Sequence, residues 1–473
     1  MNNMIFELNK FEKNLALISE EKTWTYGQLQ NVSEEIYNAV GERCLILLLC
    51  TNSFESIAGY VAFMNKKVVP MMIDADLDDE LTLKLLKLYK PKYIWLPSTL
   101  RNKFPTLREK LKLDEYVLLA TGYEKNFELH KDLALLMTTS GSTGSPKFVR
   151  QSYENILSNT ESIIEYLNIT SEDRAVTNLP MNYVYGLSII NTHLKCGASI
   201  VVTEKTLFQK EFWALMKNEG VTNLNGVPYT FMMLDKLRFM KMSLPALNFI
   251  TQAGGKLDFK LHKKFAEYAV NTDKKFFVMY GAAEATARMG YLPPENSLKK
   301  CGSIGIAIPG GRFEIVDTDG NVIDEPNCAG ELIYYGKNVS LGYAERGEDL
   351  ILDDVRHGRL ETGDIAERDE DGYYKIVGRK KRFLKIFGKR INLQEVEHIL
   401  YEHFGITEIA CAGIDDKMYI FVTDNSVAEN IVSYLSLKLN LNHAAFKVKL
   451  IEKIPKNAFG KITYKELEKF YDS

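Results

Sequence analysis

A run of hydroxyl side chains and glycines at residues 138–147 (TTSGSTGSPK) constrains this chain more than any other stretch. The apolar residues 133–137 precede it, which is typical of a buried strand that ends in a loop. Glycines admit a ligand close to backbone N–H groups and hydroxyls add donors, so this loop with its closing Lys147 suits a polyphosphate. Lys147 does not directly follow a glycine, so the run does not fit Gly-x-x-x-x-Gly-Lys-Ser/Thr. A polar surface loop is the alternative.

The bulk composition narrows the class of protein. A length of 473 residues predicts two or more domains, and a hydrophobic content of 46% is ordinary for a globular protein. The net charge of −3 argues against a nucleic-acid partner. The 6 cysteines lack metal-ligand spacing, which favours a reduced, cytoplasmic setting. We expect no signal peptide in residues 1–10, and the apolar stretch at residues 44–50 is too short to span a membrane.

Alternating strand and helix patterns predict parallel sheets covered by helices. Residues 45–50, 54–64 and 68–73 follow a strand, helix, strand order, and a second such rhythm covers residues 174–226. Residues 249–253 and 276–280 are further strand candidates. From residue 302 the segments become short, β-rich and separated by turns, which predicts a smaller β subdomain. A basic break at residues 378–382 precedes about ninety residues of mixed α/β pattern, a candidate small domain.

The loop and several later motifs resemble those of the adenylate-forming superfamily, which includes acyl- and aryl-CoA synthetases, luciferases and carrier-protein ligases. Residues 139–147 match its pattern Thr-Ser-Gly-Ser/Thr-Thr-Gly-x-Pro-Lys. The resemblance implies an α/β fold: a large N-terminal domain of parallel-sheet α/β subdomains plus a small β subdomain (residues 1–379), then a small mobile α+β C-terminal domain (residues 380–473). It also implies that the loop binds the nucleotide phosphates through Lys147 and through Thr139, Ser140, Gly141, Ser142, Thr143 and Gly144.

A second motif, residues 280–284 (YGAAE), resembles the superfamily's Tyr-Gly-x-Thr-Glu. An aromatic ring can stack on a purine and a carboxylate can hold Mg²⁺, so Tyr280 with Gly281 would face adenine and Glu284, with Thr143, would bind the metal. Gly254 and Gly255 resemble the segment on the other side of adenine. Ala283 replaces the usual Thr, which removes a hydroxyl from the α-phosphate.

The remaining catalytic motifs lie in the last third of the chain. Thr362-Gly363-Asp364 and Gly378-Arg379 match the superfamily's spacing, which implies that Asp364 and Arg379 contact the ribose. Lys461 lies in a segment that resembles Pro-Lys/Arg-Thr-x-x-Gly-Lys-Ile and would stabilise charge in the adenylation transition state. Lys381 aligns with the hinge of the mobile domain, and the loop with Gly388 and Lys385 would enter the site for the thioester step. Gly330, Gly342 and Tyr343 are expected to be structural.

The acid is constrained by residues 179–187 (LPMNYVYGL), which resemble Leu-Pro-x-x-His-x-x-Gly-Leu. Tyr183 replaces the common His beside the acyl pocket, so a role as a base is not expected. Amino-acid-activating members carry Asp where this chain has Val184, and an unpaired buried ammonium is costly, so we predict an acid without an α-amino group. Asn225, Gln252 and Met289 are expected to approach the same pocket.

The predicted reaction joins a small-molecule carboxylate to ATP with Mg²⁺, which gives an acyl-adenylate and pyrophosphate, and then transfers the acyl group to the thiol of CoA. The phosphopantetheine of an acyl carrier protein is the alternative acceptor, and the sequence does not decide between them. A non-catalytic nucleotide-binding scaffold is the alternative of another class. Ala283 and Tyr183 favour the scaffold, while the retained Lys147, Glu284 and Lys461 oppose it.

Overall fold

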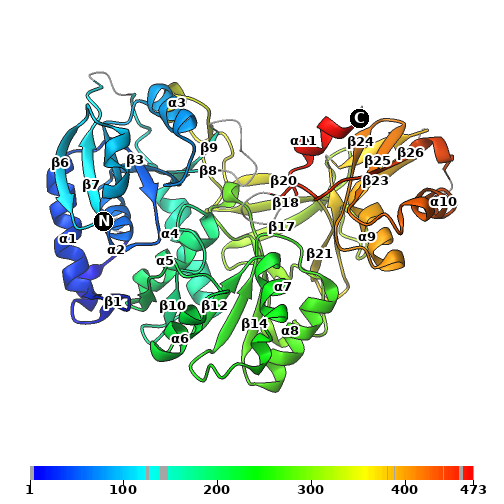
Figure 1. Ribbon diagram of the computed structural model, residues 1–473, viewed down its shortest axis with the longest axis horizontal. Coiled ribbons are helices and arrows are strands. Elements are labelled where there is room, and N and C mark those ends of the chain that lie inside the picture. The colour runs from blue at the N-terminus through cyan, green and yellow to red at the C-terminus, as the bar shows by residue number, and fades with distance from the viewer. Residues whose placement is uncertain are drawn as a thin grey trace. The chain divides into compact units, whose positions relative to one another are not determined.

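A computed structural model describes residues 5–123, 127–138, 147–380, 382–387, 389–439, 441–456 and 462–471. The chain divides into two compact units (Figure 1). The first comprises residues 1–312 and 334–360, and the second comprises residues 313–333 and 361–473. Within the described ranges, no helix combines the length and apolar character that a membrane crossing requires.

An eight-stranded sheet forms one layer of the first unit. Strands β4, β3 and β5 pair in parallel, and β4 also pairs in parallel with β8. All six residues of β3 are buried, as expected for a parallel strand covered on both faces. The strand order is β19 (Gly342–Ala344), β9 (Phe148–Ser152), β8 (Leu133–Thr138), β4 (Val69–Asp74), β3 (Leu45–Cys50), β5 (Tyr93–Pro97), β7 (Tyr116–Ala120) and β6 (Arg108–Leu113).

Helices pack on this sheet, and their ends follow from local sequence. Ser53 caps α2 (Phe54–Asn65), which packs on β3, β4 and β5. Ser152 caps α4 (Tyr153–Leu167) in a capping box with Asn155, and α4 packs on β8 and β9. The remaining helices here are α1 (Tyr26–Val40) and α3 (Asp79–Tyr89).

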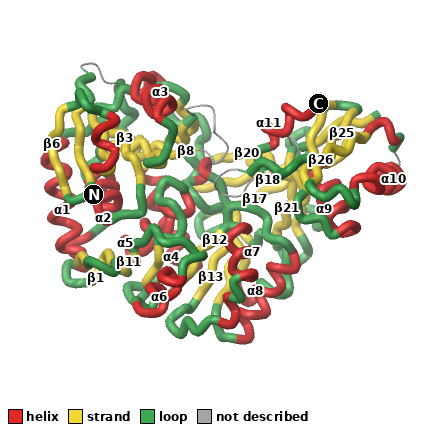
Figure 2. The backbone as a smooth tube through the Cα atoms, in the orientation of Figure 1, coloured by secondary structure: helices red, strands yellow, loops and turns green. Residues whose placement is uncertain are grey.

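A five-stranded sheet forms the second layer of this unit, with parallel strands β12 (Asn223–Gly226), β13 (Phe249–Gln252) and β14 (Lys275–Tyr280) (Figure 2). β15 (Gly290–Leu292) and β16 (Ile306–Ala307) extend it in antiparallel fashion. The helices in this part of the chain are α5 (Val184–Cys196), α6 (Lys210–Asn218), α7 (Pro228–Lys236) and α8 (Phe259–Asn271). A smaller sheet has the order β10 (Arg174–Val176), β11 (Ser199–Val201), β1 (Leu15–Ile18) and β2 (Thr23–Thr25). The predicted parallel α/β architecture is therefore confirmed.

The second unit contains shorter strands. One sheet, most of which belongs to this unit, has the order β17 (Gly311–Val316), β18 (Gly330–Gly336), β20 (Arg359–Arg368) and β21 (Tyr374–Arg379). The other strands are β22 (Phe383–Ile386), β23 (Lys389–Asn392), β24 (Ile409–Ile414), β25 (Lys417–Val422) and β26 (Phe446–Leu450). The helices are α9 (Leu393–Phe404), α10 (Ala428–Leu439) and α11 (Tyr464–Leu467). The domain boundary expected after residue 379 stays a prediction. Contacts place residues 313–333 and 361–379 in the second unit, because their strands pair with one another.

Short 3₁₀ helices connect these elements. They are η1 (Leu8–Phe11), η2 (Ser98–Lys103), η3 (Phe239–Lys241), η4 (Ala283–Ala285), η5 (Pro294–Asn296), η6 (Gly347–Ile351), η7 (His443–Ala445) and η8 (Glu468–Phe470).

Candidate active site

The carboxyl ends of three parallel strands bring several predicted site residues to one edge. The register pairs Asn225 with Thr251 and Gly226 with Gln252, while β14 ends at Tyr280. Ligands bind at this edge in open α/β sheets. The sheet therefore gathers the residues expected near adenine and near the acyl group.

Glu284 lies in η4, directly after β14, and is half-buried. The Tyr343 hydroxyl donates a hydrogen bond of 2.7 Å to Glu284 Oε1, and the Ser340 N–H donates to the Glu284 carbonyl at 2.9 Å. These contacts hold the carboxylate in one place. Its oxygens are the ligand type that Mg²⁺ prefers.

Lys147 lies beside the same tyrosine. It immediately precedes β9, and β9 pairs with β19 so that Tyr343 lies opposite Val149. The Lys147 ammonium is 3.7 Å from the centre of the Tyr343 ring, and it is also 3.7 Å from Glu345 Oε1. Tyr343 thus contacts both Lys147 and Glu284. From sequence, Tyr343 is expected to be structural, and its position after Gly342 in a superfamily motif is the signal that could have marked it.

The tyrosine remains protonated at neutral pH. Burial and the Glu284 carboxylate together raise the pKa of Tyr343 to about 12, against the opposing effect of Arg356. The Arg356 guanidinium lies 4.7 Å from the ring centre. Because the phenol keeps its proton, its role as hydrogen-bond donor to Glu284 is fixed.

A fully buried arginine holds the backbone around Tyr343. Arg150 is 0% exposed, and its Nε donates to the Tyr343 carbonyl at 3.0 Å. Its Nη2 donates to the carbonyls of Leu341 and Asp353, each at 3.1 Å, and its Nη1 donates to the Leu352 carbonyl. This one side chain therefore fixes both β19 and the loop after it.

The predicted adenine-facing glycines are required by packing inside the protein. Gly254 has a φ of +86°, and a Cβ there would lie 2.5 Å from the Tyr183 hydroxyl. A Cβ on Gly281 would lie 1.8 Å from the Ala287 carbonyl oxygen. Gln252 folds onto the first of these loops, since its Nε2 donates to the Gly255 carbonyl at 2.9 Å. Gln252 therefore shapes the Gly254–Gly255 turn.

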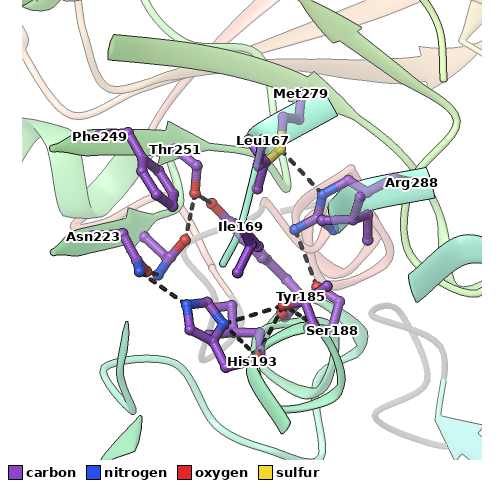
Figure 3. A pocket seen from close by; sticks show the side chains of 14 residues that line it. Leu167, Ile169, Tyr185, Ser188, His193, Asn223, Phe249, Thr251, Met279 and Arg288 are labelled. Atoms are coloured by element: carbon purple, nitrogen blue, oxygen red, sulfur yellow. Dashed lines mark hydrogen bonds between the residues drawn. The ribbon is translucent and has the colours of Figure 1, made fainter. Parts of the chain in front are cut away.

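A cavity of about 10 Å³ lies between helices α4 and α5 and one face of strands β12 and β13, and it has room for about one water molecule (Figure 3). Of the residues predicted for the acyl pocket, Asn225 lines it. Val184, Gln252 and Met289 are chain neighbours of the lining residues Tyr185, Thr251 and Arg288. Gln252 follows Thr251 in β13, and successive side chains of a strand point to opposite faces of the sheet. The Gln252 side chain therefore points away from the cavity that Thr251 lines.

The polar residues around the cavity form one directed chain of hydrogen bonds. Thr251 Oγ1 donates to Asn225 Oδ1 at 2.6 Å, so the Tyr185 hydroxyl, 2.6 Å away, is the donor to Thr251. Asn225 Nδ2 donates to Asn223 Oδ1 at 3.0 Å, and Asn223 Nδ2 donates to His193 Nε2 at 3.0 Å. Burial lowers the pKa of His193 to about 4, so the ring at the end of the chain is neutral.

In the second unit, the two predicted ribose contacts meet each other. Asp364 and Arg379 lie opposite in the β20–β21 register, and Arg379 Nε is 2.8 Å from Asp364 Oδ1. The Asp364 N–H donates to Thr362 Oγ1 at 3.1 Å. Asp364 is 4% exposed, so its carboxylate is held in place on the strand.

A family model described as AMP-binding enzyme matches residues 7–344, well over half of the chain. The chain belongs to the AMP-binding enzyme family. This finding confirms the resemblance that the motifs carried.

Known AMP-binding enzymes and their relatives match this chain to different extents. The long-chain-fatty-acid–CoA ligase of Salmonella typhimurium is 28% identical over 364 residues, which cover 73% of this chain and 63% of the relative. The match thus spans less than two thirds of that ligase. The 2-succinylbenzoate–CoA ligase of Listeria monocytogenes is 24% identical over 478 residues and covers 96% of both chains. The structure of O-succinylbenzoate coenzyme A synthetase from Bacillus subtilis with ATP and magnesium ion superposes with a TM-score of 0.76 at 23% identity, over 98% of each chain.

Several predicted site residues of this AMP-binding enzyme lie outside the described residues. They are Thr139, Ser140, Gly141, Ser142, Thr143, Gly144, Lys381, Gly388 and Lys461. Lys385 is described, and its exposed side chain extends from β22. In the ranges that the structure covers, no three His, Cys, Asp or Glu side chains cluster as a metal site. Among the described residues, Glu284 is the candidate ligand for a Mg²⁺ ion that is also bound by phosphate oxygens. Thr143 as a second ligand stays a prediction.

Proposed function

We propose that this AMP-binding enzyme is an acid–thiol ligase. A carboxylate oxygen of the substrate attacks the α-phosphorus of ATP, the bond to pyrophosphate breaks, and an acyl-adenylate forms. The sulfur of CoA then attacks the acyl carbon and releases AMP, and the thiol loses its proton. The observation that carries this proposal is the contact of Tyr343 with both Lys147 and Glu284, one cation and one carboxylate suited to MgATP.

The protein supplies positioning and electrostatic stabilisation, because the substrate is itself the nucleophile. Lys147 and the 139–144 loop bind phosphates, and Glu284 would hold Mg²⁺, which would neutralise charge on the phosphate oxygens. Tyr280 and the Gly254–Gly255 turn receive the base, and Asp364 with Arg379 receives the ribose. Lys461 stabilises the charge that develops during adenylation, and Lys381 is the hinge of the C-terminal domain.

The acid carries no α-amino group. Val184 is 8% exposed and apolar, so it cannot pair an ammonium. The nearby cavity also contains the guanidinium of Arg288, which would repel a substrate cation. Val184→Asp should therefore shift preference towards amino acids, and an unchanged preference would show that this residue does not face the substrate.

CoA is the proposed acceptor because the relatives that span this chain are CoA ligases. Incubation with ATP, Mg²⁺, an activated acid and either CoA or a phosphopantetheinylated carrier protein separates the two acceptors. Thioester formed on CoA supports the proposal, and loading of the carrier protein alone would favour the alternative.

Carboxylate-dependent exchange of labelled pyrophosphate into ATP tests the first half-reaction. The panel should include fatty acids, aromatic acids, hydroxy acids and 2-succinylbenzoate. Lys461→Ala should abolish exchange while ATP binding remains, because the lysine acts on the transition state. Binding of ATP by the wild-type chain without exchange for any acid would favour the nucleotide-binding scaffold, to which Ala283 and Tyr183 are suited.

A further inference from the structure

We propose that Arg288 binds a second carboxylate of the substrate, so that the activated acid is a dicarboxylic acid. This inference rests on the proposed acid-activating function and names its substrate class. In the part of the chain that the structure describes, the Arg288 guanidinium is buried without a carboxylate partner. Arg288 is 3% exposed, and among the described residues no carboxylate forms an ion pair with it.

The partners that Arg288 does have are weak. It donates hydrogen bonds of 3.4 Å to Ser188 Oγ and Met279 Sδ (Figure 3). It also donates to the Ala287 carbonyl at 3.4 Å and interacts with the Tyr166 hydroxyl. The Tyr185 ring lies 4.0 Å from its Cζ, a cation–π contact. A buried charge without a strong partner is expensive, so an ion pair with an anionic ligand would stabilise it.

Other arginines of this chain show how a structural guanidinium is satisfied. Arg150 donates to four backbone carbonyls, three of them at 3.0–3.1 Å. Arg382 makes two hydrogen bonds to the Glu397 carboxylate, at 2.9 and 2.7 Å. Arg288 matches neither pattern, although it is as deeply buried as a core residue. The remaining N–H donors of Arg288 are therefore available to a ligand in the cavity that this residue lines.

The backbone fixes Arg288 close to the predicted nucleotide residues. The Met289 N–H donates to the Tyr280 carbonyl at 2.8 Å, and Gly281 packs against Ala287 and Arg288. Residues 281–289 thus fold back so that Arg288 enters the cavity from beside Tyr280. In the proposed complex, the acyl part of the substrate extends from the adenylate into the cavity and meets the guanidinium there.

The rest of the described cavity lining offers no competing cation. His193 is neutral, and the Tyr185 proton is committed to Thr251. Ser188 Oγ donates to the Tyr185 carbonyl at 2.7 Å, so its hydroxyl is also engaged. An anion in this cavity therefore depends on Arg288. Since the cavity has room for about one water molecule, we commit to a carboxylate, the most compact of the common organic anions.

The test compares matched substrates and variants by pyrophosphate exchange. Linear dicarboxylic acids of increasing length are each paired with the monomethyl ester of the same acid. In the wild type, esterification should lower kcat/KM by about 10- to 100-fold, the effect of losing a hydrogen bond to a charged group. Arg288→Met should lower kcat/KM for the diacid to the value for the ester and leave the ester unchanged.

Three further variants separate this role from a structural one. Arg288→Lys keeps the charge and should retain part of the preference for the diacid. If the Arg288→Met variant does not fold, Arg288→Gln replaces it in the same comparison of diacid and ester. Arg108→Met removes an exposed arginine in β6 and should change neither substrate. Equal use of diacid and ester by the wild type, or an equal loss for both in Arg288→Met, would overturn the proposal.

A second measurement distinguishes failure of this inference from failure of the proposed function. Millimolar diacid should raise the Tm of the wild-type chain, while the ester and the Arg288→Met variant should show little shift. Thermal protection without any exchange would contradict the ligase but support the anion site. Exchange with monocarboxylic acids and no protection by any diacid would support the ligase and refute the anion site.

Discussion

At the scale of single residues, the Tyr343 hydroxyl is the group on which the candidate metal site depends. It fixes Glu284 by a 2.7 Å hydrogen bond, while the ring stays beside Lys147. A group that orients a metal ligand commonly changes metal affinity when it is removed. The hydroxyl and the ring can therefore be tested separately.

Tyr343→Phe keeps the ring and removes the donor. We expect the Mg²⁺ concentration for half-maximal pyrophosphate exchange to rise about tenfold or more, since the carboxylate loses its orientation. Titration of Mg²⁺ at saturating ATP measures the effect. Tyr37→Phe, in α1, is the control and should leave the titration unchanged. An identical Mg²⁺ dependence in Tyr343→Phe would assign the tyrosine to packing alone.

Buried histidines predict how stability depends on pH. Burial lowers the pKa of His193 from 6.5 to about 4, and His262 has the same shift for the same reason. The unfolded chain therefore binds protons more readily between these values, so stability is complete above about pH 6.5 and falls as the pH drops towards 4. Each histidine should remove roughly 2 kcal/mol at pH 5.

Urea unfolding between pH 7.5 and pH 4.5 measures this dependence. His193→Gln should lose stability at neutral pH but show a shallower decline towards acid, because the titrating ring is gone. His443→Gln, at an exposed position, should follow the wild type. A wild-type free energy of unfolding that is constant from pH 7.5 to 5 would contradict the buried neutral state of both rings.

At the scale of elements, the segment from Gly281 to Met289 joins the nucleotide and acyl sides of the candidate site. It carries Glu284 in η4 and returns to β14 through the Met289–Tyr280 hydrogen bond. Gly281 permits this return because its Cα faces the Ala287 carbonyl. The shape of the segment therefore depends on the absence of a side chain at residue 281.

Gly281→Ala should displace the segment, because the new methyl would lie 1.8 Å from a backbone oxygen. We expect destabilisation of about 1–3 kcal/mol or more and a higher KM for both ATP and the acid. Unfolding and exchange kinetics measure the two effects. The control is Gly41→Ala, which has a φ of +78° but open space around it. It should lower stability without changing either KM, and unchanged kinetics in Gly281→Ala would refute this account.

At the scale of the whole molecule, the C-terminal part of the chain has hydrophobic cores of its own. One cluster gathers residues from Leu384 to Phe446, and another gathers residues from Ala410 to Leu467. Each cluster is assembled from residues after position 383. A segment that buries its own apolar surface can fold alone.

Residues 380–473, produced as a separate chain, should therefore fold and unfold cooperatively in urea. Circular dichroism reports both the secondary structure and the transition. Leu400→Ala, at a fully buried position, should remove about 2–5 kcal/mol and shift or abolish the transition. A spectrum of unfolded chain for the wild-type segment would contradict its independence and the predicted boundary after residue 379.

The sequence alone determined the family, the α/β class and most elements, because these depend on local signals. The sequence pattern marked residues 45–50 and 249–253 as strands, and the motifs around Glu284 and Asp364 carried the resemblance. Asn225 was predicted to approach the acyl pocket, and it lines the cavity between α4, α5 and the sheet.

Only the tertiary structure decided which side chains meet. The contact of Tyr343 with Lys147 and Glu284 joins residues far apart in the chain, through strand pairing that no local pattern encodes. The sequence also does not show that Arg288 is buried without a carboxylate partner among the residues that the structure describes. Whether a charged side chain is costly depends on the partners that folding brings to it. The cavity therefore came from packing, while the motifs indicated only where along the chain to look for it.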